Sequence, residues 1–375
     1  MNNPQQKPIT ASPVIYDPET YFQQREPDRA VFLSAHGWQG SEIKLLNEDC
    51  AFRRYYRIKK DNKVSILMDS VPDTAGIATP GHKLSDYIRV GKYLSSLGFA
   101  VPRILEENEA DGFLLVEDMG DTTFRQALDS KLVDGQTLYD LATDVLIGFY
   151  ERTNVNDIEL PLYTESHIHK GRRRVIDWYL PALRKQRNPN GLVEEYLKVW
   201  ETIEQNLPPI KYTFQHIDFH LQNLMFRSDA NGIAQCGILD FQGAMRGPLP
   251  YDLVNLLDDA RIVVPHDIDK ACHARFVAAL KPEDQEGFEA WYTVLKTQFH
   301  ARVIGQFIRL AIVAKKPAYL RYIPRLHKAM RRNLDHEALH PLRDFLKDAG
   351  LDFSGSVADV TKLDETAELI SPEAF

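Results

Sequence analysis

The chain has 375 residues, 44% of them hydrophobic, and its 45 basic and 53 acidic residues give a net charge of −8. Such a chain can bury a large core, so we expect two modest domains or one two-lobed unit and exclude a wholly disordered protein. The negative charge disfavours a protein that follows a polyanion such as DNA, and we expect no nucleic-acid partner.

Cysteine and targeting patterns point to a cytoplasmic protein. Cys50, Cys236 and Cys272 are far apart and lack the close pairs of zinc ribbons and redox motifs, so we interpret them as reduced thiols. The first residues are polar and interrupted by proline, unlike a secretory signal. No apolar run approaches the length of a membrane span, and we expect no membrane partner. The oligomeric state stays open.

We divide the chain into a flexible N-terminus at 1–15, a first lobe at 16–118, a second lobe at 119–353 and a flexible tail at 354–375. In the first lobe, strand-like runs occur at 43–46, 55–58 and 64–68. A helical pattern then extends from Leu84 to Leu97 and stops at Gly98. Two more strands follow at 102–105 and 113–116, which predicts a five-stranded antiparallel sheet with one helix.

Helical patterns dominate after residue 118, beginning with a stripe from Leu138 to Phe149. A compact island at 212–240 interrupts them, with short strands predicted at 212–214, 223–226 and 236–239. Beyond Pro248 we expect helices again, through 291–314 and 326–346. The predicted fold class is α+β, with a sheet lobe and a mainly helical lobe.

The island contains the pattern His216-x-Asp218-x-x-x-x-Asn223, followed by Asp240 at the end of an apolar strand. This order and spacing are those of the catalytic loop and magnesium site of kinases. Phosphoryl transfer depends on placing the nucleophile and neutralising negative charge. Asp218 would orient a substrate hydroxyl and accept its proton, and Asn223 and Asp240 would give Mg²⁺ the oxygen ligands it prefers.

A lone His-x-Asp is more often a surface turn than a catalytic loop. The joint spacing of Asp218, Asn223 and Asp240 makes that reading unlikely here. We interpret His216 as a structural residue that holds the loop, because Asp218 already supplies the base. His220 could contact the substrate or simply pack, and the sequence does not decide between the two.

The strings at 216–225, 239–242 and 247–253 resemble the aminoglycoside phosphotransferase/choline kinase superfamily. Within it they are most similar to the bacterial kinases that phosphorylate the anomeric hydroxyl of N-acetylmuramate and N-acetylglucosamine in peptidoglycan recycling. Segments 52–57, 66–69 and 112–121 continue the resemblance, which extends from about Leu45 to Leu334. The resemblance implies a bilobal protein-kinase-like fold, ATP and Mg²⁺ as cofactors, and a small-molecule acceptor.

The resemblance also implies roles for individual residues. Backbone groups from Glu117 to Met119 would bond the adenine edge, with Val116 and Met68 lining its apolar slot. Asp252 resembles the structural aspartate that anchors the catalytic region. Because alternate residues of a strand share a face, arginines near the first turn could reach the triphosphate, and the candidates are Arg53, Arg54 and Arg57. The candidate sugar contacts are His220, Gln242, Arg302 and Gln306.

The nucleotide lobe departs from the kinase pattern in three places. The first turn reads Asn-Glu-Asp-Cys-Ala at 47–51, where the sugar kinases often have Gly-Asp-Ala-Ser. The third strand has Met68 and Asp69 where a phosphate-binding lysine is expected, and the helix from Leu84 contains no glutamate to pair with it. Phosphate binding would then depend on backbone amides, arginines and metal.

Several functions are compatible with these observations. The first is a kinase for the anomeric hydroxyl of an amino sugar, and the alternatives are an aminoglycoside, a choline-like alcohol or homoserine as acceptor. A choline site needs an aromatic cage, for which Trp178, Tyr179, Trp291 and Tyr292 are candidates. A catalytically silent nucleotide-binding protein is a further alternative, which the intact Asp218, Asn223 and Asp240 oppose.

Overall fold

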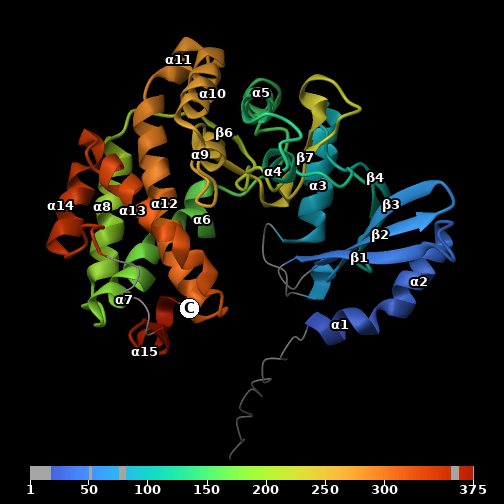
Figure 1. Cartoon of the computed structure of the whole chain (residues 1–375), viewed down its shortest axis with the longest axis horizontal. Coiled ribbons are helices and arrows are strands. Elements are labelled where there is room, and N and C mark those ends of the chain that lie inside the picture. The colour runs from blue at the N-terminus through green and yellow to red at the C-terminus, as the bar shows by residue number, and fades with distance from the viewer. Residues whose placement is uncertain (1–17, 50–52, 76–81, 356–362, 375) are drawn as a thin grey trace, which may run out of the picture. The chain divides into compact units, whose positions relative to one another are not determined.

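The computed structural model describes residues 18–49, 53–75, 82–355 and 363–374. The predicted flexible N-terminus at 1–15, and Cys50 and Ala51 of the first turn, lie outside the described residues. The chain forms two compact units, each seen in Figure 1. The first contains the residues up to Lys92 and the segment 102–118, and the second contains 93–101 and everything from Met119 onward.

The first unit is built on the five-stranded antiparallel sheet that the sequence predicts, in the order β1-β2-β3-β5-β4. Its strands are β1 (Glu42–Asp49), β2 (Arg53–Lys60), β3 (Lys63–Ser70), β4 (Ile104–Asn108) and β5 (Phe113–Val116). Helix α3 (Leu84–Ser96) follows β3 along the chain, as predicted. Alternation along the strands gives the sheet two distinct faces.

Two helices that the sequence analysis did not predict cover one of these faces. These are α1 (Pro18–Gln24) and α2 (Glu26–Ala35), which lie alongside the sheet in Figure 1. The rings of Phe32 and Phe113 stack with centroids 5.3 Å apart, and Arg25 lies 4.3 Å from the Phe113 centroid. A hydrophobic cluster joins α2 to the strands and consists of Phe32, Leu33, Tyr56, Ile58, Leu67, Phe113 and Leu115.

A buried carboxylate ties α2 to the sheet. Asp69 is fully buried on β3, and its two oxygens bind Arg25 Nε at 2.6 Å and Arg29 Nη1 at 2.8 Å. Burial raises the pKa of Asp69, and the two guanidinium groups oppose that rise. The aspartate at the expected lysine position is therefore a structural anchor on the face that packs against α2.

The second unit is mainly helical, as predicted, with α12 running through it in Figure 1. Its strands are β6 (Tyr212–Gln215), β7 (Leu224–Phe226), β8 (Cys236–Ile238) and β9 (Met245–Pro248). Its helices are α4 (Phe124–Asp129), α5 (Gly135–Arg152), α6 (His167–Lys170), α7 (Leu180–Arg184), α8 (Leu192–Asn206), α9 (Tyr251–Leu257), α10 (His266–Ala279), α11 (Pro282–Gln285), α12 (Phe288–Ile312), α13 (Ile323–Asn333), α14 (His340–Asp348) and α15 (Leu363–Ala367).

Three details differ from the sequence-based expectation. Strand β9 was not predicted, although it pairs with β6 and closes the second small sheet. The helix expected at 326–346 is two helices, α13 and α14, because the chain turns between Asn333 and His340. The segment after Lys170 tightens into 3₁₀-helix η3 (Gly171–Arg173) and then widens into π-helix η4 (Val175–Tyr179), a rare form often found at functional sites.

The remaining expectations concern thiols, membranes and the tail. Cys236 and Cys272 are free and buried. None of the helices within the described ranges has both the length and the apolar character needed to cross a bilayer. Part of the predicted tail is described, and it includes α15 and a buried Ile370.

The Asp69 network predicts a large effect on stability. Asp69→Asn should lower the free energy of unfolding by about 3 kcal/mol, because it leaves two largely buried arginines without their carboxylate. Urea titration followed by circular dichroism measures the change. Glu107→Gln breaks the exposed Lys92–Glu107 pair and should cost less than about 1 kcal/mol. Equal effects of the two substitutions would contradict the anchoring role.

Candidate active site

The loop at 216–223 joins β6 to β7 and is held by a single buried carboxylate. Asp252, near the start of α9, accepts hydrogen bonds from the backbone N–H groups of His216 and Ile217. Its own backbone N–H donates to Gln215 Oε1 at 3.0 Å. Burial raises the pKa of Asp252 to about 7, and the two N–H donors oppose that rise. Asp252 thus anchors the start of this loop.

The loop needs this anchor because its backbone is strained. Ile217 has a φ of +81°, a conformation that β-branched residues rarely adopt. Such a residue costs about 1–3 kcal/mol and persists only where its surroundings fix it. The strained turn leaves the side chain of Ile217 buried and that of the next residue, Asp218, exposed.

The structure brings together the three residues of the predicted catalytic pattern. Asn223 Nδ2 donates to the backbone oxygen of Asp218 at 3.0 Å and lies 3.4 Å from Asp240 Oδ2. Asp240 itself has a left-handed backbone with φ of +60°, and its Oδ1 accepts a 2.5 Å hydrogen bond from Gln242 Nε2. Gln242, a candidate sugar contact, therefore orients Asp240.

The two histidines of the loop differ in environment. His216 is fully buried and its Nε2 lies 2.9 Å from the backbone oxygen of Leu239, so this nitrogen must carry the proton. Burial lowers the pKa of His216 to about 4, although the Asp218 charge opposes this, and the ring is neutral near pH 7. His220 contacts the Asn223 amide at 3.4 Å, and its pKa is lowered by burial and by the Arg261 charge.

The pair Asn223 and Asp240 suits a magnesium ion. Mg²⁺ usually takes one or two carboxylates, with water and substrate phosphates completing its oxygen shell. Because Asn223 Nδ2 makes the contacts within the loop, its amide oxygen lies on the other side of the group. Across the described ranges no cluster of three His, Cys, Asp or Glu side chains could hold a metal. The donor set fits a metal that a bound phosphate helps to hold.

In the first unit, strand register separates the candidate nucleotide residues into two groups. Arg53, Arg57 and Met68 share one face with Val116, because Arg57 pairs with Ile66, which in turn pairs with Val116. Arg54 lies on the opposite face, where it forms an ion pair with Glu19 and packs over the Phe22 ring at 5.0 Å. The structure thus removes Arg54 from the candidate set.

The other members of this set are partly engaged. Arg53 is 1% exposed. Arg57 Nε lies 2.6 Å from Asp118 Oδ2, so Arg57 holds the segment after β5 against β2. The Glu117 N–H donates to the backbone oxygen of Arg103 at 2.9 Å, so this donor of the expected hinge already has a partner. In the second unit, Met119 packs so closely on Gly237 that a Cβ there would lie 2.6 Å from Met119 Cε.

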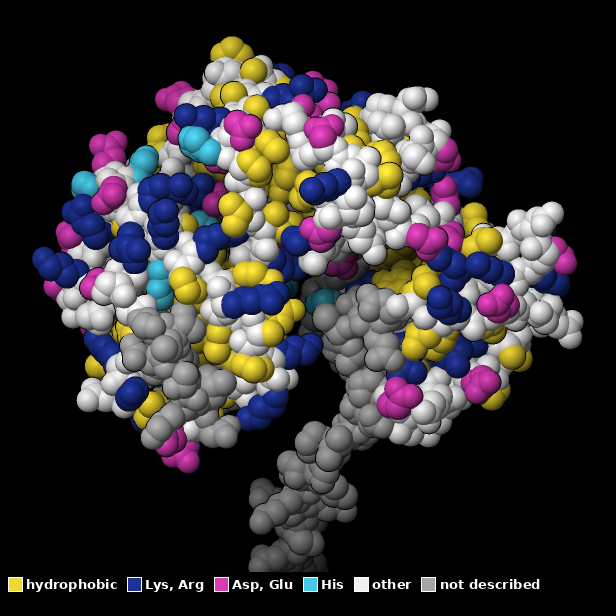
Figure 2. Space-filling model, viewed as in Figure 1, with side chains coloured by type: hydrophobic (Ala, Val, Ile, Leu, Met, Phe, Trp, Pro, Cys, Tyr) yellow, Lys and Arg dark blue, Asp and Glu magenta, His cyan; other side chains and the backbone are white. Residues whose placement is uncertain are grey.

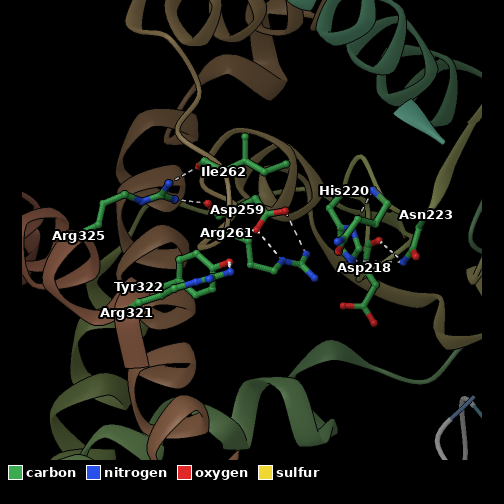
Figure 3. Close-up of polar contacts among 10 residues, drawn as sticks. Asp218, His220, Asn223, Asp259, Arg261, Ile262, Arg321, Tyr322 and Arg325 are labelled. Atoms are coloured by element: carbon green, nitrogen blue, oxygen red, sulfur yellow. Dashed lines mark hydrogen bonds and ion pairs between the residues drawn. The ribbon is translucent and has the colours of Figure 1, made fainter. Parts of the chain in front are cut away.

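The loop after α9 carries charges that the sequence analysis did not single out. Arg261 is paired twice with Asp259, at 2.9 and 3.0 Å, and Arg325 donates to the backbone oxygens of Asp259 and Ile262. Figure 3 shows the Arg261 guanidinium extending toward the 216–223 loop, and its charge acts on His220. A run of charges directly after the Asp252 helix was the available signal in the sequence.

Beside the loop after α9 lies a cavity of about 520 Å³. Its wall includes Asp258, which lies 2.8 Å from Lys296 Nζ and 3.4 Å from His300 Nε2. Burial alone would raise the pKa of Asp258, but His300 and Lys296 lower it to about 2. Figure 2 shows Lys and Arg side chains gathered on the face of this unit that carries α12, α13 and α14.

The remaining predicted acceptor residues lie on α12. Arg302 and Gln306 are one helical turn apart and both are partly exposed. Arg302 Nη2 lies 3.4 Å from the Tyr251 hydroxyl, and its guanidinium lies 5.3 Å from the Phe299 ring centroid. The four aromatic candidates for a choline cage are core residues, with exposed fractions of 0–9%: Trp178, Tyr179, Trp291 and Tyr292.

Comparison with known proteins gives consistent matches. The family model described as "Phosphotransferase enzyme family" matches residues 42–291. The N-acetylmuramate/N-acetylglucosamine kinase of Caulobacter vibrioides is 28% identical over 334 residues, covering 82% of this chain and 92% of the relative. The protein of the same name from Pseudomonas aeruginosa is 28% identical over 303 residues, covering 78% and 85%.

Solved structures agree on the fold. The GDP complex of wild-type aminoglycoside 2'-phosphotransferase-IIIa has a TM-score of 0.57 at 11% identity, covering 85% of this chain and 100% of that chain. A choline kinase from Streptococcus pneumoniae has a TM-score of 0.52 at 12% identity, covering 87% and 99%. These matches confirm the predicted fold class and the predicted resemblance.

The anchoring of the 216–223 loop leads to a prediction. Asp252→Ala should lower the free energy of unfolding by about 2–4 kcal/mol, because two buried N–H groups lose their acceptor. Hydrogen exchange at the His216 and Ile217 amides should accelerate at the same time. Asp229→Ala, in the exposed turn after β7, is the control and should change stability by less than about 0.5 kcal/mol. Unchanged exchange in Asp252→Ala would show that something else holds the loop.

Proposed function

This chain belongs to the phosphotransferase enzyme family, and we propose that it transfers phosphate from ATP to the anomeric hydroxyl of an amino sugar. The family membership makes it a small-molecule phosphotransferase. The observation that carries the proposal is the convergence of Asp218, Asn223 and Asp240 on one anchored loop and the strand beside it. This is the arrangement that phosphoryl transfer needs.

In the proposed mechanism Asp218 is the base. Its carboxylate is exposed, and Figure 3 shows it pointing away from the Asn223 amide, where an acceptor hydroxyl can approach. It would orient that hydroxyl and take its proton as the oxygen attacks the γ-phosphorus. His216 is buried and neutral, so its proposed part is to hold the loop through Leu239.

Asn223 and Asp240 would hold Mg²⁺. When bound, the ion would supply neutralisation of the charge on the phosphate oxygens. Gln242 fixes the orientation of Asp240, and Asn223 ties the metal position to the backbone of Asp218. The base and the metal ligands are therefore set by one hydrogen-bonded network.

For the nucleotide, we propose that Met68 and Val116 line an apolar slot for adenine and that backbone groups from Glu117 to Met119 bond the adenine edge. The two side chains share one sheet face with Arg53. Arg57 would act by holding Asp118 and the hinge in place. A solved structure of similar fold contains GDP, so GTP is the donor to compare with ATP.

The acceptor is proposed from the names of the relatives and from local charge. Two relatives that cover most of this chain are N-acetylmuramate/N-acetylglucosamine kinases. Arg302 lies against Tyr251, whose pKa also responds to the Asp218 charge, so a cation is already present beside the proposed base. A cationic acceptor such as choline or an aminoglycoside would therefore meet like-charge repulsion there.

Asp218→Asn tests the proposed base. It should lower turnover by at least about 100-fold, because proton acceptance is lost. The affinity for ATP should stay within about threefold, since the substitution keeps the loop and the metal ligands. Steady-state kinetics and calorimetry with ATP and Mg²⁺ measure the two effects, and Asp229→Asn is the matched control. A variant that retains most of its turnover would exclude Asp218 as the base.

The acceptor chemistry gives a second test. With ATP and Mg²⁺, N-acetylmuramate or N-acetylglucosamine should yield a sugar 1-phosphate, identified by phosphorus coupling to the anomeric proton. The methyl glycosides, whose anomeric oxygen is blocked, should not react, and a chelator should stop the reaction. Efficient phosphorylation of the blocked glycosides, or a preference for choline, homoserine or an aminoglycoside, would refute the sugar assignment and leave the phosphotransferase mechanism intact.

A further inference from the structure

We propose that Arg174, Arg302 and Arg309 form an anion subsite in the second unit that binds a carboxylate of the acceptor. The subsite rests on the proposed function, because the acceptor in question is the sugar that Asp218 activates. It predicts that the chain prefers an acidic amino sugar, such as N-acetylmuramate with its lactyl carboxylate, over the neutral N-acetylglucosamine.

The first two arginines of the subsite come from one helix face. Arg302 and Arg309 are seven residues apart on α12, with Gly305 and Gln306 between them, so all four residues lie along the same side of the helix. Both arginines are partly exposed. Arg309 lies 6.0 Å from the Trp178 ring centroid, which places it beside π-helix η4.

Two glycines, Gly171 and Gly305, lie where Arg174, the third arginine of the subsite, packs against α12. A Cβ at Gly305 would lie 2.0 Å from the backbone oxygen of Arg174 and 2.7 Å from Arg174 Cβ. A Cβ at Gly171 would lie 2.9 Å from Arg302 Cδ. A Cβ at Gly305 would overlap the Arg174 backbone, so the packing of Arg174 on α12 requires glycine at 305, whereas the flexible Arg302 side chain could shift away from a Cβ at Gly171. The close approach places Arg174 next to Arg302 and Arg309.

The three positive charges lack compensation. Among the residues that the structure describes, no carboxylate forms an ion pair with Arg174, Arg302 or Arg309. Asp177 is the carboxylate whose charge acts on Arg174, but it is held by Arg173 at 2.7 and 3.1 Å. Burial and then the charges of Arg302 and Arg309 lower the pKa of Arg174 to about 10. A bound anion would relieve this repulsion.

Other arginines of the unit do not show this pattern. Arg172 donates to the backbone oxygen of His169 at 2.8 Å. Arg261 is held by Asp259 through two contacts. Arg325 donates to two backbone oxygens. Each therefore has a carboxylate or backbone oxygen as partner, whereas Arg302 donates only to the Tyr251 hydroxyl at 3.4 Å, and a planar carboxylate would suit the guanidinium groups of the subsite.

The subsite lies close to the proposed base. Arg302 contacts the Tyr251 hydroxyl at 3.4 Å. Burial raises the pKa of Tyr251 to about 12, the Arg302 charge opposes this rise, and the Asp218 charge adds to it. Tyr251 thus lies within range of both charges and contacts Arg302 directly. An acceptor that presents a hydroxyl to Asp218 would therefore carry its other substituents on the side of Arg302.

A neutral group in the subsite also suits an N-acetylated sugar. Among the described residues, the amide oxygen of Gln306 is buried and has no hydrogen-bond partner. A buried acceptor without a donor costs about 1–3 kcal/mol. An acetamido N–H or a ring hydroxyl of the acceptor would satisfy it, and Gln306 would then orient the ring between the arginines and Asp218.

The test compares one acidic acceptor with two neutral ones, of which the methyl ester keeps the lactyl group and N-acetylglucosamine lacks it. The kcat/KM values of the wild-type chain are compared for N-acetylmuramate, its neutral methyl ester and N-acetylglucosamine. The acid should be favoured by about 10–100-fold over both neutral sugars, the range expected for losing charged hydrogen bonds. This comparison needs no variant and so does not depend on whether a substitution folds.

The variants Arg174→Gln and Arg309→Gln should bring the ratio of acid to ester close to one, and Arg309→Lys should retain part of it. Arg343→Gln, on the exposed side of α14, is the control and should keep the wild-type ratio. A wild-type ratio near one, or ratios that the two Gln variants leave unchanged, would overturn the subsite while the kinase assignment stands.

If neither sugar is phosphorylated, the proposed function fails and the subsite is judged by anion binding. Sulfate should then raise the melting temperature of the wild-type chain more than that of Arg174→Gln and Arg309→Gln, as ligand linkage requires. A smaller shift in both variants supports an anion site with another acidic ligand. Equal shifts in the three proteins would overturn the subsite as well.

Discussion

The candidate site depends on one buried carboxylate, Asp252. By accepting the N–H groups of His216 and Ile217, it holds a β-branched residue at a φ of +81° and thereby turns Asp218 outward. Asn223 then ties Asp218 to Asp240, and the neutral His216 ties the loop to β8 through Leu239. The proposed base and metal ligands are therefore positions of one network, fixed from behind by a residue that need not touch a substrate.

The first unit uses a buried carboxylate in a different way. Met68 and Asp69 stand where the sequence pattern leads us to expect a lysine, and register places Asp69 on the face that packs against α2, where Arg25 and Arg29 compensate it. Met68, which precedes Asp69 on β3, lies on the opposite face together with Val116. Arg54 is committed to the α1 side through Glu19, whereas Arg53 and Arg57 lie on the face of Val116, where Arg57 pairs with Asp118. The carboxylate at position 69 thus helps to hold α2 against the sheet.

Sequence patterns predicted most of the fold and the core of the site because both depend on local signals. Alternating strands gave the five-stranded sheet, and the spacing of Asp218, Asn223 and Asp240 identified the loop. Strand β9 was missed because Met-Arg-Gly-Pro has no strand alternation and exists by pairing with β6. Arg174 was missed because its position depends on contact with Gly305, more than a hundred residues away. Arg302 was named only through the resemblance, and Arg54 faces away from Arg53 because adjacent residues of a strand point to opposite faces.

In the helical unit, the proposed preference for an acidic acceptor comes from the packing of helices. Gly305 lets α12 meet the backbone of Arg174 at a distance that any other residue would prevent, and this contact places cations from separate segments together. The π-helical widening at 175–179 follows directly, as expected where a chain departs from α-helical register to meet a packing constraint. Bringing like charges together costs stability in the free protein, and the cost falls when an anion binds. The repulsion among the three arginines of the proposed subsite therefore favours an acidic acceptor over a neutral one and disfavours a cationic one. In this proposal the arginines bind the acceptor and do not contact the phosphate that is transferred.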